Sequence, residues 1–169
     1  GRFAVFASDQ PQPNAKNLIP AELEKAARAK GNAWTVWMRN VISGTNFAMT
    51  PGISTGAGTQ PQISPDGTTI TFVSNPQTPG IETAGGGTWD PQPDIFQIKP
   101  VFSGGNPILS GPLTCASCKD AVGQPAASPA TSANGGSVAY TLGNSLWLRD
   151  MINGTSNQMV PPASGGIST

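Results

Sequence analysis

The sequence contains no histidine among its 169 residues, and this absence restricts its chemistry more than any residue that is present. Histidine is the usual general base of nucleophilic catalysis at neutral pH and the commonest metal ligand. A Ser-His-Asp triad is therefore excluded, and a zinc site would lack imidazole ligands. We predict that the chain is not an enzyme and carries neither a catalytic residue nor a metal site.

Charged residues are also scarce, at 11% of the chain, and nine basic residues balance nine acidic ones. Because the sequence has no basic stripe, we expect no nucleic-acid partner. No apolar run approaches the ~20 residues that a membrane-spanning helix needs, so we expect no membrane span.

The sequence shows no signal peptide and does not start with methionine, so we interpret its N-terminus as a processed, truncated or incompletely known end. Low charge, many Asn, Thr, Ser and Gly residues, and a Cys-x-x-Cys pair together favour an extracytoplasmic location. The protein would then be periplasmic, exposed at the cell surface or secreted.

Glycine and proline are abundant, with 21 and 17 residues, and they separate short apolar runs. A tight turn that leads into an apolar strand occurs at residues 64–74 and again at 132–141, and residues 1–8 repeat the strand without its turn. Both faces of each strand are mostly apolar, which is typical of a strand covered on both sides. Such repetition predicts a radially repeated β-architecture.

Further strands follow each repeated strand in the same order. A second strand rich in aromatic and aliphatic residues leads through a Gly turn into a last short strand, and a short strand precedes the turn in the later two units. The second strands are 35–40, 94–99 and 145–150, the last strands 46–50, 107–110 and 156–160, and the preceding strands 61–64 and 126–128. We expect Phe6, Phe72 and Tyr140 to occupy equivalent inner strands, and Trp37, Phe96 and Trp147 to occupy matching places on the second strands.

The predicted fold class is all-β: a β-propeller built from four-stranded antiparallel blades, with one short helix in an inserted loop. The helix is expected over residues 20–31, where Pro20 and Gly31 mark its ends. We place all of residues 1–169 in one partial propeller. Its units are approximately 1–58, 59–111 and 124–169, and its insertions are 9–33, 75–93 and 111–125.

The pattern Ser-Pro-Asp-Gly-x-x-Ile-x-Phe-x-Ser at 64–74, followed by residues 94–98 and 104–107, resembles the TolB-like, WD-repeat-like β-propeller repeat. The first unit is similar to a variant found in secreted bacterial proteins, whereas the third unit departs from the pattern with Asn134 in place of the aspartate. The resemblance implies a ring of about six to eight blades, so the remaining blades would come from the same longer chain or from another copy.

The same resemblance implies a protein or peptide partner, bound at the ring face or in the central channel. We therefore expect a non-catalytic extracytoplasmic module for protein binding or a structural scaffold, with no cofactor. A second hypothesis is an accessory domain of a hydrolase, which the absence of histidine disfavours.

The motif Cys115-Ala116-Ser117-Cys118-Lys119 leaves three interpretations open. The first is a local disulfide in an exposed linker, and the second is a redox dithiol or half of a metal site completed by another chain. The third is covalent attachment of haem c, with Lys119 standing where the usual motif has the histidine ligand. This third interpretation gives the alternative function: a c-type haem-bearing or cytochrome-associated electron-transfer subunit.

Other candidates are weaker. The Gly-x-Ser-x-Gly pattern at 52–56 lacks the histidine and the strand-turn-helix context of a nucleophile elbow. Asp90 and Asp94 could offer carboxylates to calcium, but flanking prolines favour turn and strand-start roles. Trp34 and Trp89 fall in insertions and are candidates for an exposed contact surface, whereas the two other tryptophans are expected in the core.

Overall fold

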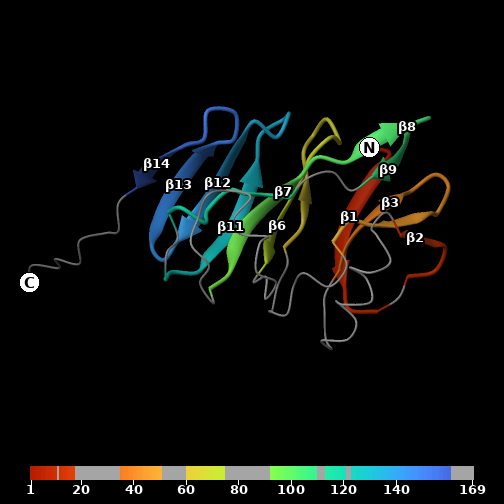
Figure 1. Cartoon of the computed structure of the whole chain (residues 1–169), viewed down its shortest axis with the longest axis horizontal. Helices are drawn as coiled ribbons and strands as arrows, with labels where there is room; N and C mark the ends of the chain where they lie inside the picture. Colours follow the sequence, from red (N-terminus) through yellow and green to blue (C-terminus); the bar gives the residue numbers. More distant parts are fainter. Residues whose placement is uncertain are drawn as a thin grey trace, which may run out of the picture.

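The structure is a computed structural model that describes residues 1–10, 12–17, 35–50, 60–74, 92–109, 113–120 and 123–160 (Figure 1). These residues form three four-stranded sheets and one two-stranded sheet. The strands are β1 (Phe3–Ser8), β2 (Ala15–Asn17), β3 (Thr35–Asn40), β4 (Asn46–Ala48), β5 (Gln62–Ile63), β6 (Ile70–Ser74), β7 (Asp94–Ile98), β8 (Val101–Ser103), β9 (Asn106–Leu109), β10 (Leu113–Cys115), β11 (Ala126–Thr131), β12 (Ser137–Leu142), β13 (Ser145–Asp150) and β14 (Thr155–Val160).

The described part of the chain is all-β, which confirms the predicted class. It contains no helix that could cross a bilayer. The helix expected over 20–31 lies outside the described residues.

The three four-stranded sheets lie side by side in the order of the sequence, as blades of a partial propeller do (Figure 1). One apolar cluster joins the first sheet to the second, with Met38 and Phe47 facing Phe72 and Phe96. A second cluster joins the second sheet to the third, and Tyr140 belongs to it. The middle sheet is therefore covered on both faces, as the doubly apolar strands predicted.

Equivalent strands carry equivalent residue pairs in all three sheets. Cross-strand partners are Phe6 and Trp37 in the first sheet, Phe72 and Phe96 in the second, and Tyr140 and Trp147 in the third. The expected equivalence of these inner strands is confirmed, because each aromatic pair occupies the same register of its blade.

The first sheet differs from the prediction in its fourth strand. Its order is β1-β3-β4-β2, and β2, from the first insertion, pairs parallel with β4 instead of antiparallel. Asn46 anchors this strand: its side-chain amide donates to the carbonyl of Pro13 (2.7 Å) and its backbone N–H to that of Asn14 (3.3 Å). The insertion thus covers an edge that the last strand would otherwise expose.

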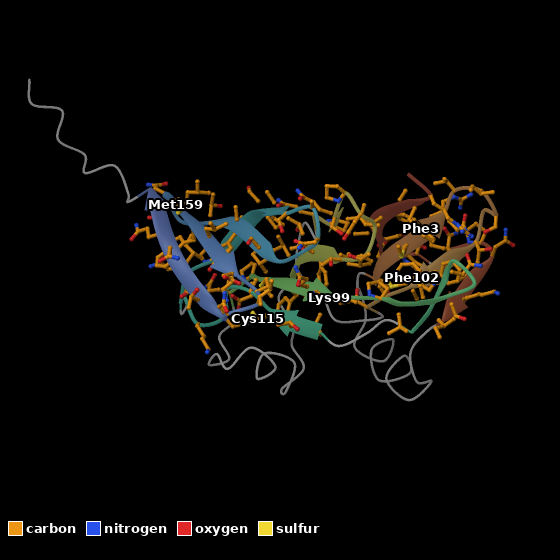
Figure 2. The ribbon with its side chains drawn as sticks, turned by 90° about the horizontal axis from the view of Figure 1, so that it is seen from above. Phe3, Lys99, Phe102, Cys115 and Met159 are labelled. Atoms are coloured by element: carbon orange, nitrogen blue, oxygen red, sulfur yellow. A yellow bond between two sulfur atoms is a disulfide. The ribbon has the colours of Figure 1, made fainter. Side chains whose placement is uncertain are left out.

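The second sheet also departs from the prediction. The expected last strand at 107–110 contributes to β9, which pairs with β8 in a separate hairpin, and β10 takes the edge beside β7. Pro100 lies between the end of β7 at Ile98 and the start of β8 at Val101, and it has no backbone N–H with which to continue the ladder. The β8–β9 hairpin packs against the first sheet instead. There the Phe102 and Phe3 ring centroids are 5.6 Å apart (Figure 2). The Asn40 side-chain amide also donates to Asn106 Oδ1.

The repeated turn has the same hydrogen bonds in the second and third units. The first serine's hydroxyl accepts from the backbone N–H five residues later, at 3.0 Å for Ser64 and 2.9 Å for Ser132. The side chain of Asp66 accepts from the backbone N–H two residues later, and Asn134 does the same. Asparagine therefore replaces aspartate here without a change in turn geometry.

Two exposed turn aspartates give a pH-dependent contribution to stability. Hydrogen bonds, chiefly from Ser64, lower the pKa of Asp66, and those of Asn153 lower the pKa of Asp150, both from the ordinary value of 3.8. Because a lowered folded-state pKa stabilises above the unfolded value, this contribution is lost as the pH falls below about 4. We expect the double substitution D66N/D150N to flatten the decline of the urea midpoint between pH 4 and pH 2.5. A decline as steep as that of the unchanged protein would contradict this assignment.

Candidate functional site

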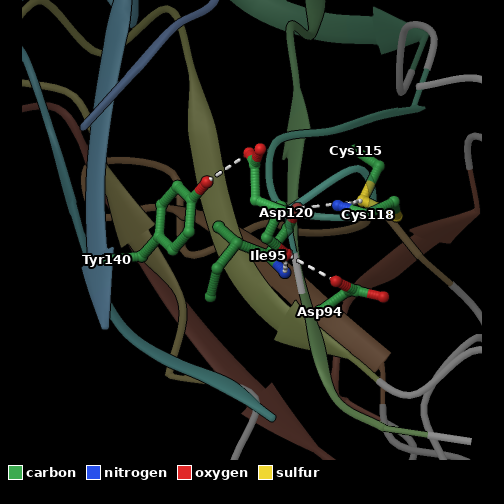
Figure 3. The surroundings of a disulfide bond; sticks show 7 residues. Asp94, Ile95, Cys115, Cys118, Asp120 and Tyr140 are labelled. Atoms are coloured by element: carbon green, nitrogen blue, oxygen red, sulfur yellow. Dashed lines mark hydrogen bonds between the residues drawn. A yellow bond between two sulfur atoms is a disulfide. The ribbon is translucent and has the colours of Figure 1, made fainter. Parts of the chain in front are cut away.

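The cysteine motif forms a closed, buried loop at the end of β10. Cys115 and Cys118 are joined by a disulfide with their Cα atoms 5.8 Å apart, and their side chains are 2% and 3% exposed (Figure 3). The backbone N–H of Ala116 donates to the carbonyl of Ile95 at 2.7 Å, so the loop extends the pairing between β10 and β7. The disulfide therefore lies within the packed core and not in an exposed linker.

Ser117 connects this loop to the start of β7. Its hydroxyl donates to Asp94 Oδ1 (2.6 Å) and accepts from the backbone N–H of Ile95 (2.8 Å). Asp94, predicted as a calcium candidate, is only 4% exposed and is hydrogen-bonded in this structural network. Its oxygen and the two cysteine sulfurs lie within 4.8 Å of one another, but disulfide sulfurs are not thiolates and do not ligate metals in the way thiolates do.

Asp120 extends the same loop to the third sheet. Tyr140 donates its hydroxyl to Asp120 Oδ2 at 2.8 Å (Figure 3). The Ser156 hydroxyl donates to the same oxygen at 2.5 Å. Arg149 in turn donates to Ser156 (2.9 Å). Burial, reinforced by the hydrogen bond to Asp120, raises the pKa of Tyr140, so this phenol stays protonated and acts as a donor. The loop thus ties the second and third blades together.

Removal of the Tyr140 hydroxyl tests this connection. Because Tyr140→Phe removes a charge-assisted hydrogen bond and keeps the buried ring, we expect a loss of about 1–3 kcal/mol in the free energy of unfolding. Urea denaturation followed by tryptophan fluorescence measures it. An unchanged midpoint would mean that Asp120 does not join the blades.

The haem hypothesis gains no support from this geometry. Thioether attachment uses the sulfurs of both cysteines, and here Cys115 and Cys118 are bonded to each other. Lys119, the proposed axial ligand, is exposed next to the buried loop. A visible absorption spectrum of the purified protein, with or without a Soret band, tests this prediction directly.

Other predicted site residues lie outside the described residues. These are Trp34, Trp89, Asp90 and the pattern at 52–56. Trp37 and Trp147, expected in the core, lie on β3 and β13, where they are 8% exposed and partly buried, respectively.

The structure also reveals a candidate binding surface that sequence reasoning missed. It lies where the first strands of the second and third sheets, β5 and β11, come together, and we name it the β5–β11 rim. It is a concave region of about 370 Å³ lined by Gln60, Pro61, Gln62, Ser128 and Pro129. The backbone N–H of Ser128 donates to Gln60 Oε1 at 3.1 Å, which links the two strands.

The rim has unusual backbone geometry. Gln60 and Ser128 have φ values of 32° and 52°, in the region that favours glycine, and a register shift interrupts β11 between Ala127 and Ala130. Such conformations cost about 1–3 kcal/mol each and cluster at functional surfaces. The prolines at 61 and 129 were the only sequence signal for this irregularity, since neither glutamine nor serine predicts a positive φ.

Another candidate binding surface is a cleft between the first and second sheets. It has a volume of about 460 Å³ and lies between β1, the 64–68 turn and the β8–β9 hairpin. Arg2 and Asp66 line it together with the rings of Phe3 and Phe102. Sequence reasoning missed this cleft, because it depends on where the hairpin packs.

Comparisons with known proteins identify no family for this chain. No family model and no curated protein matches the chain. It is similar to the structure of a protein assigned as TolB from Agrobacterium tumefaciens, with a TM-score of 0.48 and 17% identity over 75% of this chain and 40% of that one. It is also similar to TolB from Acinetobacter baumannii, with a TM-score of 0.28 and 16% identity over 76% of this chain and 38% of that one. The chain therefore spans about 40% of the length of these proteins.

Proposed function

We propose that this chain is a non-catalytic, extracytoplasmic scaffold that binds an extended polypeptide segment of a protein partner at the β5–β11 rim. The observation that carries the proposal is the rim itself: two edge strands, exposed glutamine side chains at Gln60 and Gln62, and positive φ at Gln60 and Ser128. A strained backbone at a solvent-facing edge lowers the stability of the fold, and such strain is typical of binding sites.

The chemistry of the rim favours an uncharged, extended ligand. Both β5 and β11 are terminal strands of their sheets, so each has backbone donors and acceptors directed away from its only partner strand. Peptides bind such edges by adding main-chain hydrogen bonds. Gln60, Gln62 and Ser128 add neutral donors and acceptors, which pair with peptide groups without selecting for charge.

The disulfide supports the extracytoplasmic part of the proposal. Structural disulfides persist in oxidising compartments and are rare in the cytosol. The remaining blades, from the same longer chain or another copy, would cover the outer face of the third sheet, where Leu146 is 39% exposed. A scaffold role follows from this packing, because the described strands are occupied in holding blades together.

Selection from a displayed library of random peptides tests the proposal. We expect enriched peptides to bind the purified chain and to lose about two- to tenfold in affinity on Gln60→Ala, the effect of about one hydrogen bond. Gln124→Ala, which removes an exposed glutamine elsewhere, is the matched control and should leave affinity unchanged. Enrichment of no peptide, or equal effects of the two substitutions, would refute binding at the rim.

A further inference from the structure

The cleft between the first and second sheets has an apolar floor and charged walls. Its floor consists of the half-buried side chains of Phe3, Ile63 and Phe102, and the two rings are 5.6 Å apart (Figure 2). Its volume of about 460 Å³ is within the range of small-ligand sites. The two charged side chains that line it, Arg2 and Asp66, come from different blades.

Arg2 is exposed, lies near Phe3 and Gly105, and has no acidic partner among the described residues. Its guanidinium carbon lies 5.7 Å from the centre of the Phe3 ring, and its nitrogen Nη1 lies so close to Gly105 that a Cβ there would collide with it. No carboxylate of the described residues forms an ion pair with Arg2. An unpaired guanidinium has its planar donors free for a carboxylate, which it binds through two parallel hydrogen bonds.

Asp66 supplies the opposite charge at the turn. Its Oδ1 accepts from the Ser64 hydroxyl (2.6 Å), the Thr68 hydroxyl (2.8 Å) and the Thr68 backbone N–H (3.0 Å). These bonds fix the carboxylate and occupy one oxygen, so the other oxygen can accept from an N–H donor of a ligand. A negative charge at this place also disfavours phosphates and other polyanions.

We propose that this cleft binds the C-terminal residue of a polypeptide that ends in a large apolar amino acid. The terminal carboxylate binds the Arg2 guanidinium, the apolar side chain packs on Phe3, Ile63 and Phe102, and the last backbone N–H donates to Asp66. This combination of a carboxylate, an apolar side chain and an N–H donor within one residue matches the three parts of the cleft. The site is separate from the β5–β11 rim and does not depend on the function proposed there.

Peptides with a free or an amidated C-terminus test whether the cleft binds a terminal carboxylate. The probes are an N-acetylated hexapeptide that ends in phenylalanine with a free carboxylate, the same peptide amidated, and one that ends in glycine. We expect the free phenylalanine peptide to bind at least tenfold tighter than either control, as measured by fluorescence anisotropy. Equal binding of the free and amidated peptides would overturn the proposal.

A pair of glycine substitutions separates the position of Arg2 from its charge. In Gly105→Ala the new Cβ displaces the guanidinium, whereas Gly104→Ala has a similar positive φ and no atom within 4 Å. We expect Gly105→Ala and Arg2→Ala to weaken the free peptide about tenfold, and Gly104→Ala and Lys99→Ala to leave it unchanged. Circular dichroism checks that each variant folds. Equal effects of the two glycine variants, or no effect of Arg2→Ala, would refute the site. Gln60→Ala, which alters the β5–β11 rim, should not change peptide binding in this cleft.

Discussion

Replacing Gly135 with alanine is expected to lower the free energy of unfolding by about 3 kcal/mol. Gly135 has a φ of +68°, and a left-handed conformation costs a residue with a side chain about 1–2 kcal/mol. A Cβ here would also collide with Thr69 of the neighbouring blade, with the Thr69 Cβ at 2.6 Å and Cγ2 at 2.7 Å. Because Thr69 is fully buried, it has no room to move, and overpacking adds about 1–3 kcal/mol.

The carbonyl of Gly135 also takes part in the contact between the second and third blades. It accepts a buried hydrogen bond of 2.9 Å from the side-chain amide of Gln97, which belongs to the second sheet. The backbone N–H of Asp66 also donates to the carbonyl of Ala133 at 3.2 Å. Any displacement of the third unit's turn would therefore weaken two hydrogen bonds between the second and third blades.

Gly67→Ala is the matched control for this prediction. Gly67 occupies the equivalent position in the second unit with a φ of +76°, and a Cβ there would have no atom within 4 Å. We expect it to cost only the conformational part, about 1–2 kcal/mol. Urea denaturation followed by far-UV circular dichroism measures both variants. Equal losses would show that the turns of neighbouring blades do not touch in solution.

Removal of the disulfide is the second change for which we expect a large effect. The loop that Cys115 and Cys118 close has a sequence separation of 3, and chain-entropy reasoning assigns about 2 kcal/mol to so short a loop. Both side chains also pack in the apolar cluster between the first and second sheets, so C115A/C118A loses buried contacts as well. We expect a loss of at least about 2 kcal/mol in the free energy of unfolding.

The position of the loop predicts coupling between distant residues. Asp120 leaves the loop to accept the Tyr140 hydroxyl, so opening the disulfide should loosen this bond. In a double-mutant cycle, Tyr140→Phe should therefore cost less in the C115A/C118A background than in the unchanged protein. Additive losses would show that the disulfide and the Tyr140 contact act independently. Intact mass before and after reduction verifies that the unchanged protein starts with the disulfide formed, since reduction to two thiols adds two hydrogen atoms.

The disulfide interpretation correctly predicted the Cys115–Cys118 bond, but it did not predict that the bond would be buried. The short spacing of the cysteines indicated a local bond, but the sequence placed the motif in an inserted linker. In the structure, β10 reaches the motif as an edge strand of the second sheet and buries Cys115. Neither strand of the β8–β9 hairpin occupies this edge of β7, and Pro100, which precedes β8, has no backbone N–H for such pairing.

The buried disulfide loop, the rim and the cleft differ in how far local sequence could predict them. The Cys-x-x-Cys loop is contiguous, so its residues could be named in advance. The cleft brings together Arg2, Asp66 and Phe102, and the rim brings together Gln60 and Ser128. Residues so far apart in the chain meet only because neighbouring blades stack, and no local pattern encodes their separation.

The sequence by itself determined the repeated inner strands, their order and the turns that lead into them. Alternating apolar residues and a glycine at a positive φ act over a few residues, so they can be recognised without knowing the partner strand. Only the tertiary structure decided which strand closes each sheet, as β2 and β10 show, and which side chains line the cleft and the rim. Edge pairing and blade stacking join residues far apart in the chain, and their outcome depends on which exposed edge or apolar face each segment can cover.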